Sequence, residues 1–167
     1  PGELKILWAN AKKEAGGKFG ILNTWDNQLV SWGIAQFAGH AGTLAALMAD
    51  LKEDPRTRAA FDHFFVASGI DVDYGPYPWK DTTKTGNHVV VRADGKLLRG
   101  DDGWRYSRTQ PRLLGAFLLA GNDASLQLGQ LVFWRRVILV KAIGKIVSSR
   151  CETAGDSYVG PEHSNGS

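Results

Sequence analysis

The chain has 167 residues, 43% of them hydrophobic and 22% charged, which is close to an ordinary globular protein of one domain. No run of about 18 apolar residues occurs, so we expect no membrane span. The net charge of +3 favours anionic partners but is too small to indicate nucleic acid by itself.

The start of the chain and its cysteine content bear on where the protein works. The sequence does not start with a basic and then apolar secretory signal. Because it starts with Pro1-Gly2 and without an initiator Met, we expect a processed chain or an excised domain. A single cysteine, Cys151, excludes an intramolecular disulfide framework.

Helical periodicity and capping residues predict helix over most of the chain. Gly16-Gly17 ends the first helix, Asp54-Pro55 starts the third, and Gly121 ends the next to last. The apolar face of the last helix, which includes Leu128, predicts a central, buried element. The predicted helices cover residues 3–14, 43–52, 54–68, 110–119 and 124–149, with a short helical turn at 33–38.

The β signal is weaker and local. Asp94-Gly95 lies between two β-prone runs, which predicts a hairpin over residues 88–99. Residues 18–30 are expected to form a loop or a short hairpin, and the Gly-, Pro- and Asp-rich residues 70–86 a long ordered loop. We therefore expect a mainly α (α+β) domain over residues 1–150, with two helical lobes and a small β-hairpin, followed by a tail over 151–167.

Two acidic residues flank a turn-rich segment near the start of the chain. Glu14 lies in the last turn of the first predicted helix, where the negative end of the helix dipole favours the protonated carboxyl that a general acid requires. Asp26 follows on the far side of the turn, among Asn23, Thr24 and Asn27. Two carboxyl groups on separate elements are what cleavage of a glycosidic bond requires.

The sequence motifs around these acids resemble those of a known family. Glu14-Ala15-Gly16-Gly17, then Trp25-Asp26, then Ser31-Trp32-Gly33-Ile34-Ala35-Gln36-Phe37 resembles the lysozyme-like superfamily, and within it goose-type lysozymes and related lytic transglycosylases. It also resembles peptidoglycan-hydrolase domains of bacterial effectors, including those delivered by type VI secretion. The late Tyr-Asn segment typical of lytic transglycosylases has no counterpart closer than Gly121-Asn122.

The resemblance implies a fold, an activity and a set of site residues. Glu14 matches the catalytic acid, and Asp26 resembles the acid that positions water in goose-type enzymes. Residues 33–36 match the segment that lines the sugar-binding cleft of a two-lobed fold. Substrate-binding candidates from the motif are Ser31, Gly33 and Gln36. Aromatic faces suit sugar rings, so the polar loop adds Tyr74, Tyr77 and Trp79, whereas Trp25, Trp32 and Phe37 are expected in the core.

The main hypothesis is a muramidase that cleaves the N-acetylmuramic acid–N-acetylglucosamine bond of peptidoglycan and acts as an antibacterial toxin. A lytic transglycosylase that yields 1,6-anhydro products, or a non-catalytic wall-binding module, remains an alternative. Spacing alone does not separate inversion from retention. We expect a monomer that requires no cofactor or metal and binds no nucleic acid. We also expect an immunity protein as a partner, and secretion or delivery to the periplasm of a target cell.

Overall fold

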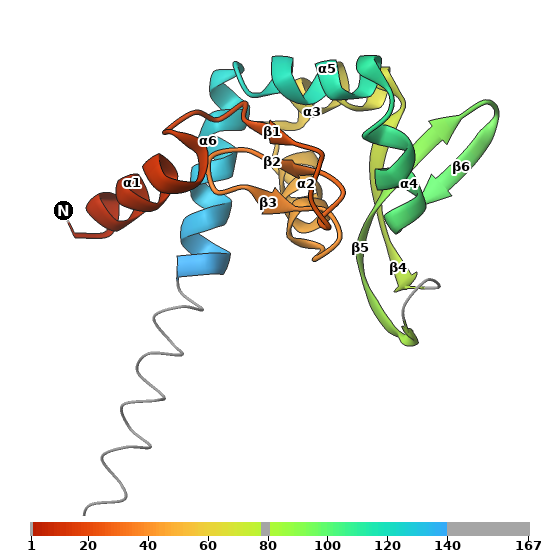
Figure 1. Ribbon diagram of the computed structural model, residues 1–167, viewed down its shortest axis with the longest axis horizontal. Helices are drawn as coiled ribbons and strands as arrows, with labels where there is room; N and C mark the ends of the chain where they lie inside the picture. Colours follow the sequence, from red (N-terminus) through yellow and green to blue (C-terminus); the bar gives the residue numbers. More distant parts are fainter. Residues whose placement is uncertain (1, 78–80, 140–167) are drawn as a thin grey trace, which may run out of the picture. The chain divides into compact units, whose positions relative to one another are not determined.

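The computed structural model of the chain describes residues 2–77 and 81–139 (Figure 1). Two compact units are distinguished, residues 1–133 and residues 134–167. Of the second unit, only the π-helical segment η2 (Trp134–Leu139) is described. The predicted tail over 151–167, and the part of the last predicted helix beyond residue 139, lie outside the described residues.

The first unit alternates helices with two small antiparallel sheets. Its first half contains α1 (Gly2–Ala15), β1 (Leu22–Asn23), β2 (Ser31–Trp32), β3 (Phe37–Ala38), α2 (Thr43–Glu53), α3 (Arg58–Phe64) and the 3₁₀ turn η1 (Val66–Ser68). Its second half contains β4 (Ile70–Tyr77), β5 (Asp81–Ala93), β6 (Lys96–Arg99), α4 (Gly100–Ser107), α5 (Pro111–Ala120) and α6 (Ala124–Phe133). One sheet has the order β1-β2-β3 and the other β4-β5-β6.

Helix α2 connects the two sheets of this unit. It contacts β3 of the first sheet, β4 and β5 of the second, and helices α3 and α6 (Figure 1). The faces that meet there are apolar, and the α2 residues Leu44, Leu47 and Met48 are fully buried. Burial of these side chains stabilises the unit.

An aromatic cluster fills the core beside this helix. The ring of Trp32 on β2 packs edge-on against Phe65 and Phe117, with centroids 5.7 and 5.5 Å apart. Phe65 and Phe117 in turn lie 5.0 Å apart. Because Trp32 is fully buried, the first sheet is anchored to the core through its central strand. The prediction that Trp32 and Phe37 belong to the core is confirmed.

The segment predicted as a long ordered loop, residues 70–86, needs correction, because its described residues 70–77 and 81–86 belong to two strands of the second sheet. Strand β4 pairs with β5 from Ile70 opposite Val91 to Tyr77 opposite Asp81, with an irregularity between Pro76 and Tyr77. The predicted hairpin over 88–99 is confirmed, since β5 pairs with β6. Asp94 and Gly95 form its turn, both with positive φ.

Two helix predictions near the middle of the chain need correction. Residues 33–38 form no helical turn, because Gly33 and Gln36 adopt positive φ and the chain enters β3. The helix predicted from Asp54 begins only at Arg58. Asp54 instead accepts hydrogen bonds from the backbone N–H and the guanidinium of Arg56, and so forms a turn before the helix.

Helix α6 starts where the sequence predicts. The Asp123 carboxylate caps it, because Oδ1 accepts hydrogen bonds from the backbone N–H groups of Ser125 and Leu126. The predicted core face is wrong in one respect: Leu128 is exposed, and Gln130 is fully buried in its place.

The fold class is therefore an α+β mixture with two three-stranded sheets. Among the described residues, none of the helices combines the length and the apolar character that crossing a membrane requires.

Candidate functional site

Glu14 lies in the last turn of α1, and its side chain is exposed. The helix ends because Gly16 and Gly17 both adopt the left-handed conformation. The Gly17 N–H donates to the Ala11 carbonyl, and the Lys18 N–H to that of Ala15. The chain therefore reverses directly after the acid, as the Gly-Gly pair predicts.

Asp26 lies in the loop between β1 and β2, and its carboxylate is held in one orientation. Oδ1 accepts a hydrogen bond from the backbone N–H of Gln28 at 2.9 Å, and Oδ2 accepts one from Nδ2 of Asn23 at 3.2 Å. Asn23 ends β1, so the direction of the carboxylate is fixed by the sheet. Of the polar neighbours that the sequence places around Asp26, Asn23 contacts the carboxylate directly.

Trp25 is a residue whose role sequence reasoning missed. It was expected in the core, but 81% of its surface is exposed. Its backbone N–H donates to Oδ1 of Asn23, so the loop that orients Asp26 also presents the indole to solvent. A large exposed aromatic face next to an oriented carboxylate is a surface on which a sugar ring can stack. The signal available in the sequence was its position in a run of turn-forming polar residues.

Ser31, Gly33 and Gln36 shape the same segment from within. Ser31 is buried at the centre of the sheet, opposite Asn23 on one side and Ala38 on the other. Nε2 of Gln36 donates to the carbonyl oxygens of Ile21 and Gly33 at 3.1 and 3.2 Å. The Gly33 N–H also donates to Ile21. In this structure the three residues hold the turn and the sheet together.

Gln130 of α6 closes the segment from the core side. Its Oε1 accepts a hydrogen bond from the Ile34 N–H at 3.0 Å, and its Nε2 donates to the Phe19 carbonyl at 3.4 Å. A side chain on Gly33 would overlap the Gln130 amide. The glycine of the Gly-x-x-Gln motif is thus required by a residue about a hundred positions away, which no local pattern could indicate.

A hollow of about 430 Å³ adjoins the turn that follows Glu14. Lys18, Phe19, Gly20 and Ile21 form one wall. The other wall comes from the end of α5 and the start of α6, namely Leu118, Gly121, Asn122 and Gln127.

The two walls touch at a glycine pair. A Cβ on Gly121 would overlap Gly20, so the backbones meet without intervening side chains. The hollow is polar at its rim, because Asn122 and Gln127 lie there and donate to the carbonyls of Leu118 and Gly121.

The aromatic candidates of the predicted loop lie on the other sheet. Tyr74 on β4 is exposed, and its hydroxyl is 3.1 Å from Oγ1 of Thr85. It lines a separate hollow of about 240 Å³ with Lys52 and Arg58, to which no residue of the segment 14–37 contributes. Tyr77 ends β4, and its side chain lies outside the described part of the structure, as does the whole of Trp79.

Comparison of the chain with protein-family models, curated proteins and solved structures finds no match. The assignment of a function therefore depends on the site itself.

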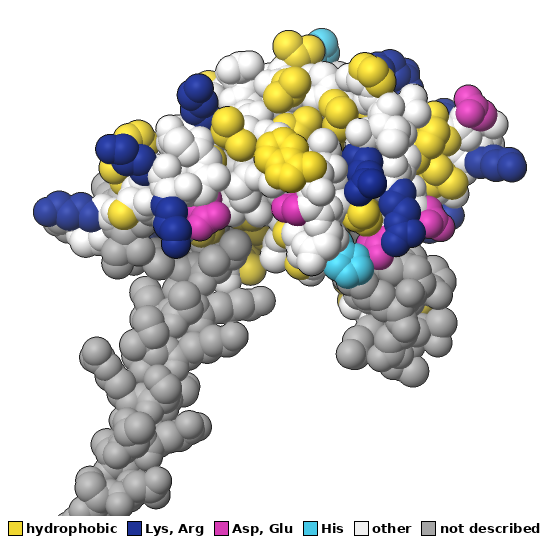
Figure 2. Space-filling model, viewed as in Figure 1, with side chains coloured by type: hydrophobic (Ala, Val, Ile, Leu, Met, Phe, Trp, Pro, Cys, Tyr) yellow, Lys and Arg dark blue, Asp and Glu magenta, His cyan; other side chains and the backbone are white. Residues whose placement is uncertain are grey.

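The charges around the site are mixed. On the face shown in Figure 2, hydrophobic side chains gather near the centre, and Lys and Arg alternate with acidic residues toward both sides. Within the described residues, no group of three or more His, Cys, Asp or Glu side chains is arranged to hold a metal ion. The chemical resources of the site are thus an exposed carboxyl group, an oriented carboxylate, an exposed indole and a polar hollow.

Proposed function

We propose that the chain is a peptidoglycan hydrolase of the muramidase type, with a lysozyme-like fold. In this proposal Glu14 is the general acid and Asp26 the second carboxylate. The wider setting proposed from the sequence, an antibacterial effector matched by an immunity protein, depends on this activity.

The observation that carries the proposal is the way the segment 14–37 folds as one unit. An exposed acid at a helix end, a left-handed glycine turn and a small sheet follow one another. Gln36 and Gln130 fix the turn through Ile21 and Phe19. Catalytic groups that act on a glycan need such a rigid support, because a displacement of about 1 Å costs much of the rate.

Each residue has a defined role in the proposed reaction. Glu14 protonates the oxygen of the leaving sugar as the glycosidic bond breaks. Asp26 stabilises the positive charge that develops at the sugar centre, or takes a proton from the attacking water. Trp25 stacks on a sugar ring, and the hollow lined by Asn122 accepts polar groups of the same strand.

A lytic transglycosylase is the second candidate, and the surroundings of Asp26 favour it. Both carboxylate oxygens already accept hydrogen bonds within the protein, which reduces their capacity to bind a water. In a transglycosylase the C6 hydroxyl of the substrate attacks, and Asp26 is less needed. Asn122 beside the Glu14 turn also provides an asparagine where the sequence lacks the family's late Tyr-Asn segment.

Digestion of purified peptidoglycan, with mass analysis of the released fragments, tests both candidates. The proteins compared are the wild type, Glu14→Gln, Asp26→Asn and, as a matched carboxylate control on the far sheet, Asp73→Asn. We expect Glu14→Gln to lower the rate by about 10²- to 10⁴-fold, the usual contribution of a general acid. Asp73→Asn should leave it unchanged.

The products decide between the two reactions. Reducing-end fragments that are lost in both Glu14→Gln and Asp26→Asn indicate a hydrolase that uses the acid pair. Anhydro fragments that are lost only in Glu14→Gln indicate a transglycosylase. Full activity of Glu14→Gln, or no release by a folded wild type that binds wall material, would refute the enzyme proposal.

A further inference from the structure

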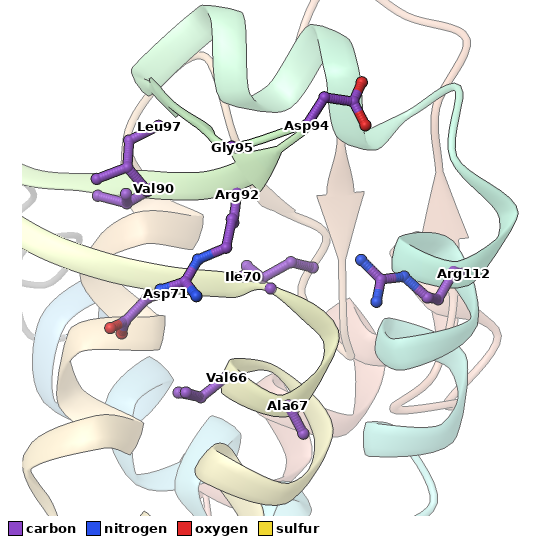
Figure 3. A pocket seen from close by; sticks show the side chains of 11 residues that line it. Val66, Ala67, Ile70, Asp71, Val90, Arg92, Asp94, Gly95, Leu97 and Arg112 are labelled. Atoms are coloured by element: carbon purple, nitrogen blue, oxygen red, sulfur yellow. The ribbon is translucent and has the colours of Figure 1, made fainter.

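A second cavity, of about 580 Å³, lies on the outer face of the sheet β4-β5-β6 (Figure 3). Its lining comes from this sheet, from η1 and from the first turn of α5. None of the residues of the segment 14–37 contributes to it. It is therefore a site separate from the proposed catalytic one.

The register of the sheet shows which side chains face this cavity. Val72, Val89 and Val91 are buried on the inner face, toward α2 and α4. Ile70, at the start of β4, is also buried but contributes to the lining of the cavity. Asp71, Val90, Arg92 and Leu97 alternate with the inner-face residues and belong to the outer face. Arg92 lies directly opposite Leu97 across the β5–β6 ladder.

The outer face departs from the usual pattern of a sheet with one solvated side. Such a face is expected to be polar, yet Val90 and Leu97 lie on it, and Leu97 is 52% exposed. Val66, on the opposite wall of the cavity, is also exposed. Exposed apolar side chains that face one another across a hollow indicate a surface that a ligand covers.

Two arginines line the cavity. Arg92 extends from β5 over β4, and Arg112 reaches in from the start of α5, with its Nη2 close to Gly69 (Figure 3). Neither guanidinium forms a hydrogen bond or ion pair with any residue that the structure describes. Arg56 and Arg58, by contrast, are paired with Asp54 and Asp62.

Neither of the two acids that line the cavity forms an ion pair with these arginines. Asp71 is engaged by Lys52, whose Nζ is 2.8 Å from Oδ1, and by the N–H of Val72. Asp94 lies in the β5–β6 turn, and its carboxylate points away from the guanidinium of Arg112 (Figure 3). The cavity is thus lined by two arginines and two aspartates, and Asp71 is already paired with Lys52. The two guanidinium groups keep their donor forks, which match the geometry of a carboxylate.

We propose that this cavity binds the C-terminal carboxylate of a short peptide that ends in a small aliphatic residue. The guanidinium groups of Arg92 and Arg112 hold the carboxylate, and the aliphatic side chain packs against Val66 and Leu97. The volume supports a peptide over a bare anion, because a single inorganic ion would leave most of about 580 Å³ empty. This inference does not depend on the proposed catalytic activity.

Isothermal titration of the full chain with N-acetyl-dialanine tests the proposal, with its C-terminal amide and inorganic phosphate as comparison ligands. We expect saturable binding of the free acid, and binding at least about tenfold weaker for the amide and for phosphate, since only the acid offers both the carboxylate and the methyl group. Glu14→Gln should bind the acid as the wild type does.

Substitutions of the lining residues test which side chains contact the peptide. Arg92→Gln and Arg112→Gln should each weaken binding by about tenfold or more, and Leu97→Ser by a smaller factor. Arg112→Lys keeps the positive charge but loses the paired N–H donors of the guanidinium group, so it should also weaken binding. This variant replaces Arg112→Gln in the test if Arg112→Gln fails to fold. Arg105→Gln, which removes an exposed arginine from α4, should have no effect.

The stereochemistry of the peptide distinguishes its source. Preference for the L,L-dipeptide indicates a protein C-terminus, and preference for the D,D-dipeptide indicates a peptide of the bacterial wall. The proposal is overturned if the folded wild type binds neither dipeptide, if phosphate binds as well as the peptide acid, or if neither arginine variant affects the affinity.

Discussion

Asp26 and Trp25 are neighbours in the chain, and Asn23 contacts both of them. Its side-chain amide donates to the Asp26 carboxylate, and its carbonyl oxygen accepts from the Trp25 N–H. One asparagine thus helps to orient the carboxylate of Asp26 and fixes the backbone at Trp25. In the proposed reaction the two residues have different tasks, since Asp26 acts at the reacting sugar centre and Trp25 binds a sugar ring.

The first prediction concerns Trp25. We expect Trp25→Ala to weaken sedimentation of the protein with purified peptidoglycan several-fold, because it removes the exposed aromatic face beside Asp26. Its melting temperature should change little, since the indole is largely in solvent. Tyr74→Ala is the matched control, because Tyr74 is an exposed aromatic on the other sheet. A loss of binding in Tyr74→Ala but not in Trp25→Ala would move the sugar contact to β4.

The second prediction concerns Asp54. Hydrogen bonds from the Arg56 guanidinium, and then from its backbone N–H, lower the pKa of Asp54 from 3.8 to about 2. Because the pKa is depressed in the folded state, the stabilisation is present above pH 3.8 and is lost as the pH falls toward 2. Carboxyl NMR should therefore show a titration midpoint near pH 2.

Removal of the partner tests this cause. In Arg56→Gln the pKa of Asp54 should rise toward its ordinary value, and the pH dependence of stability in that window should become smaller. An unchanged midpoint in this variant would show that the guanidinium is not responsible.

At the scale of elements, the sequence predicts the helix ends and turns that depend on a few neighbouring residues. The Gly16-Gly17 stop, the Asp94-Gly95 turn and the Asp123 cap all appear where expected. These features depend on a few neighbouring residues, so the pattern contains the information.

Strand β4 shows where local reading fails. Ile70 and Val72 alternate with Asp71 and Asp73, which is a strand signal, but Gly75 and Pro76 suggest a loop. Pairing with β5 over eight positions outweighs that local preference. The pairing energy comes from a distant segment, so composition alone could not reveal it.

The candidate site likewise has one part that the sequence predicts and one part that it does not. Its acids and its Gly-x-x-Gln segment are visible in the sequence, because they form one continuous stretch. The clamp by Gln130 and the wall formed by Asn122 come from residues far along the chain, and only packing brings them to this stretch.

The third prediction concerns the joint between α6 and the first sheet. Gln130→Leu would leave the buried Ile34 N–H without its partner, which costs about 1–3 kcal/mol, and would also remove the partly buried bond to the Phe19 carbonyl. We expect this loss in the free energy of unfolding measured by urea denaturation. Gln127→Leu on the same helix should cost less, because its bond to the Gly121 carbonyl is only half-buried and water can replace it. Equal costs for the two variants would contradict the role of Gln130.

At the scale of the whole molecule, the described core is concentrated in residues 1–133. Helix α2 packs against both sheets and against α6, so the two sheets stabilise each other through one helix. The proposed catalytic segment and the proposed peptide cavity therefore belong to the same compact unit, although they share no lining residue.

The fourth prediction follows from this division. A chain shortened to residues 1–139 should unfold in one cooperative transition, within a few degrees of the full chain, because it keeps every element of the first unit. Thermal denaturation followed by circular dichroism measures this. A broad, non-cooperative transition would show that residues beyond 139 are needed to complete the core.

The contact between Gly20 and Gly121 has a consequence for how the sequence can change over evolution. Most packed pairs can exchange volume, so that one residue grows while its partner shrinks. Here both partners already have the smallest side chain, and a methyl group at position 121 would overlap the opposite backbone. No compensating substitution exists on either side. Saturation mutagenesis should therefore find position 121 intolerant of every replacement, and second-site suppressors should move a whole segment of backbone.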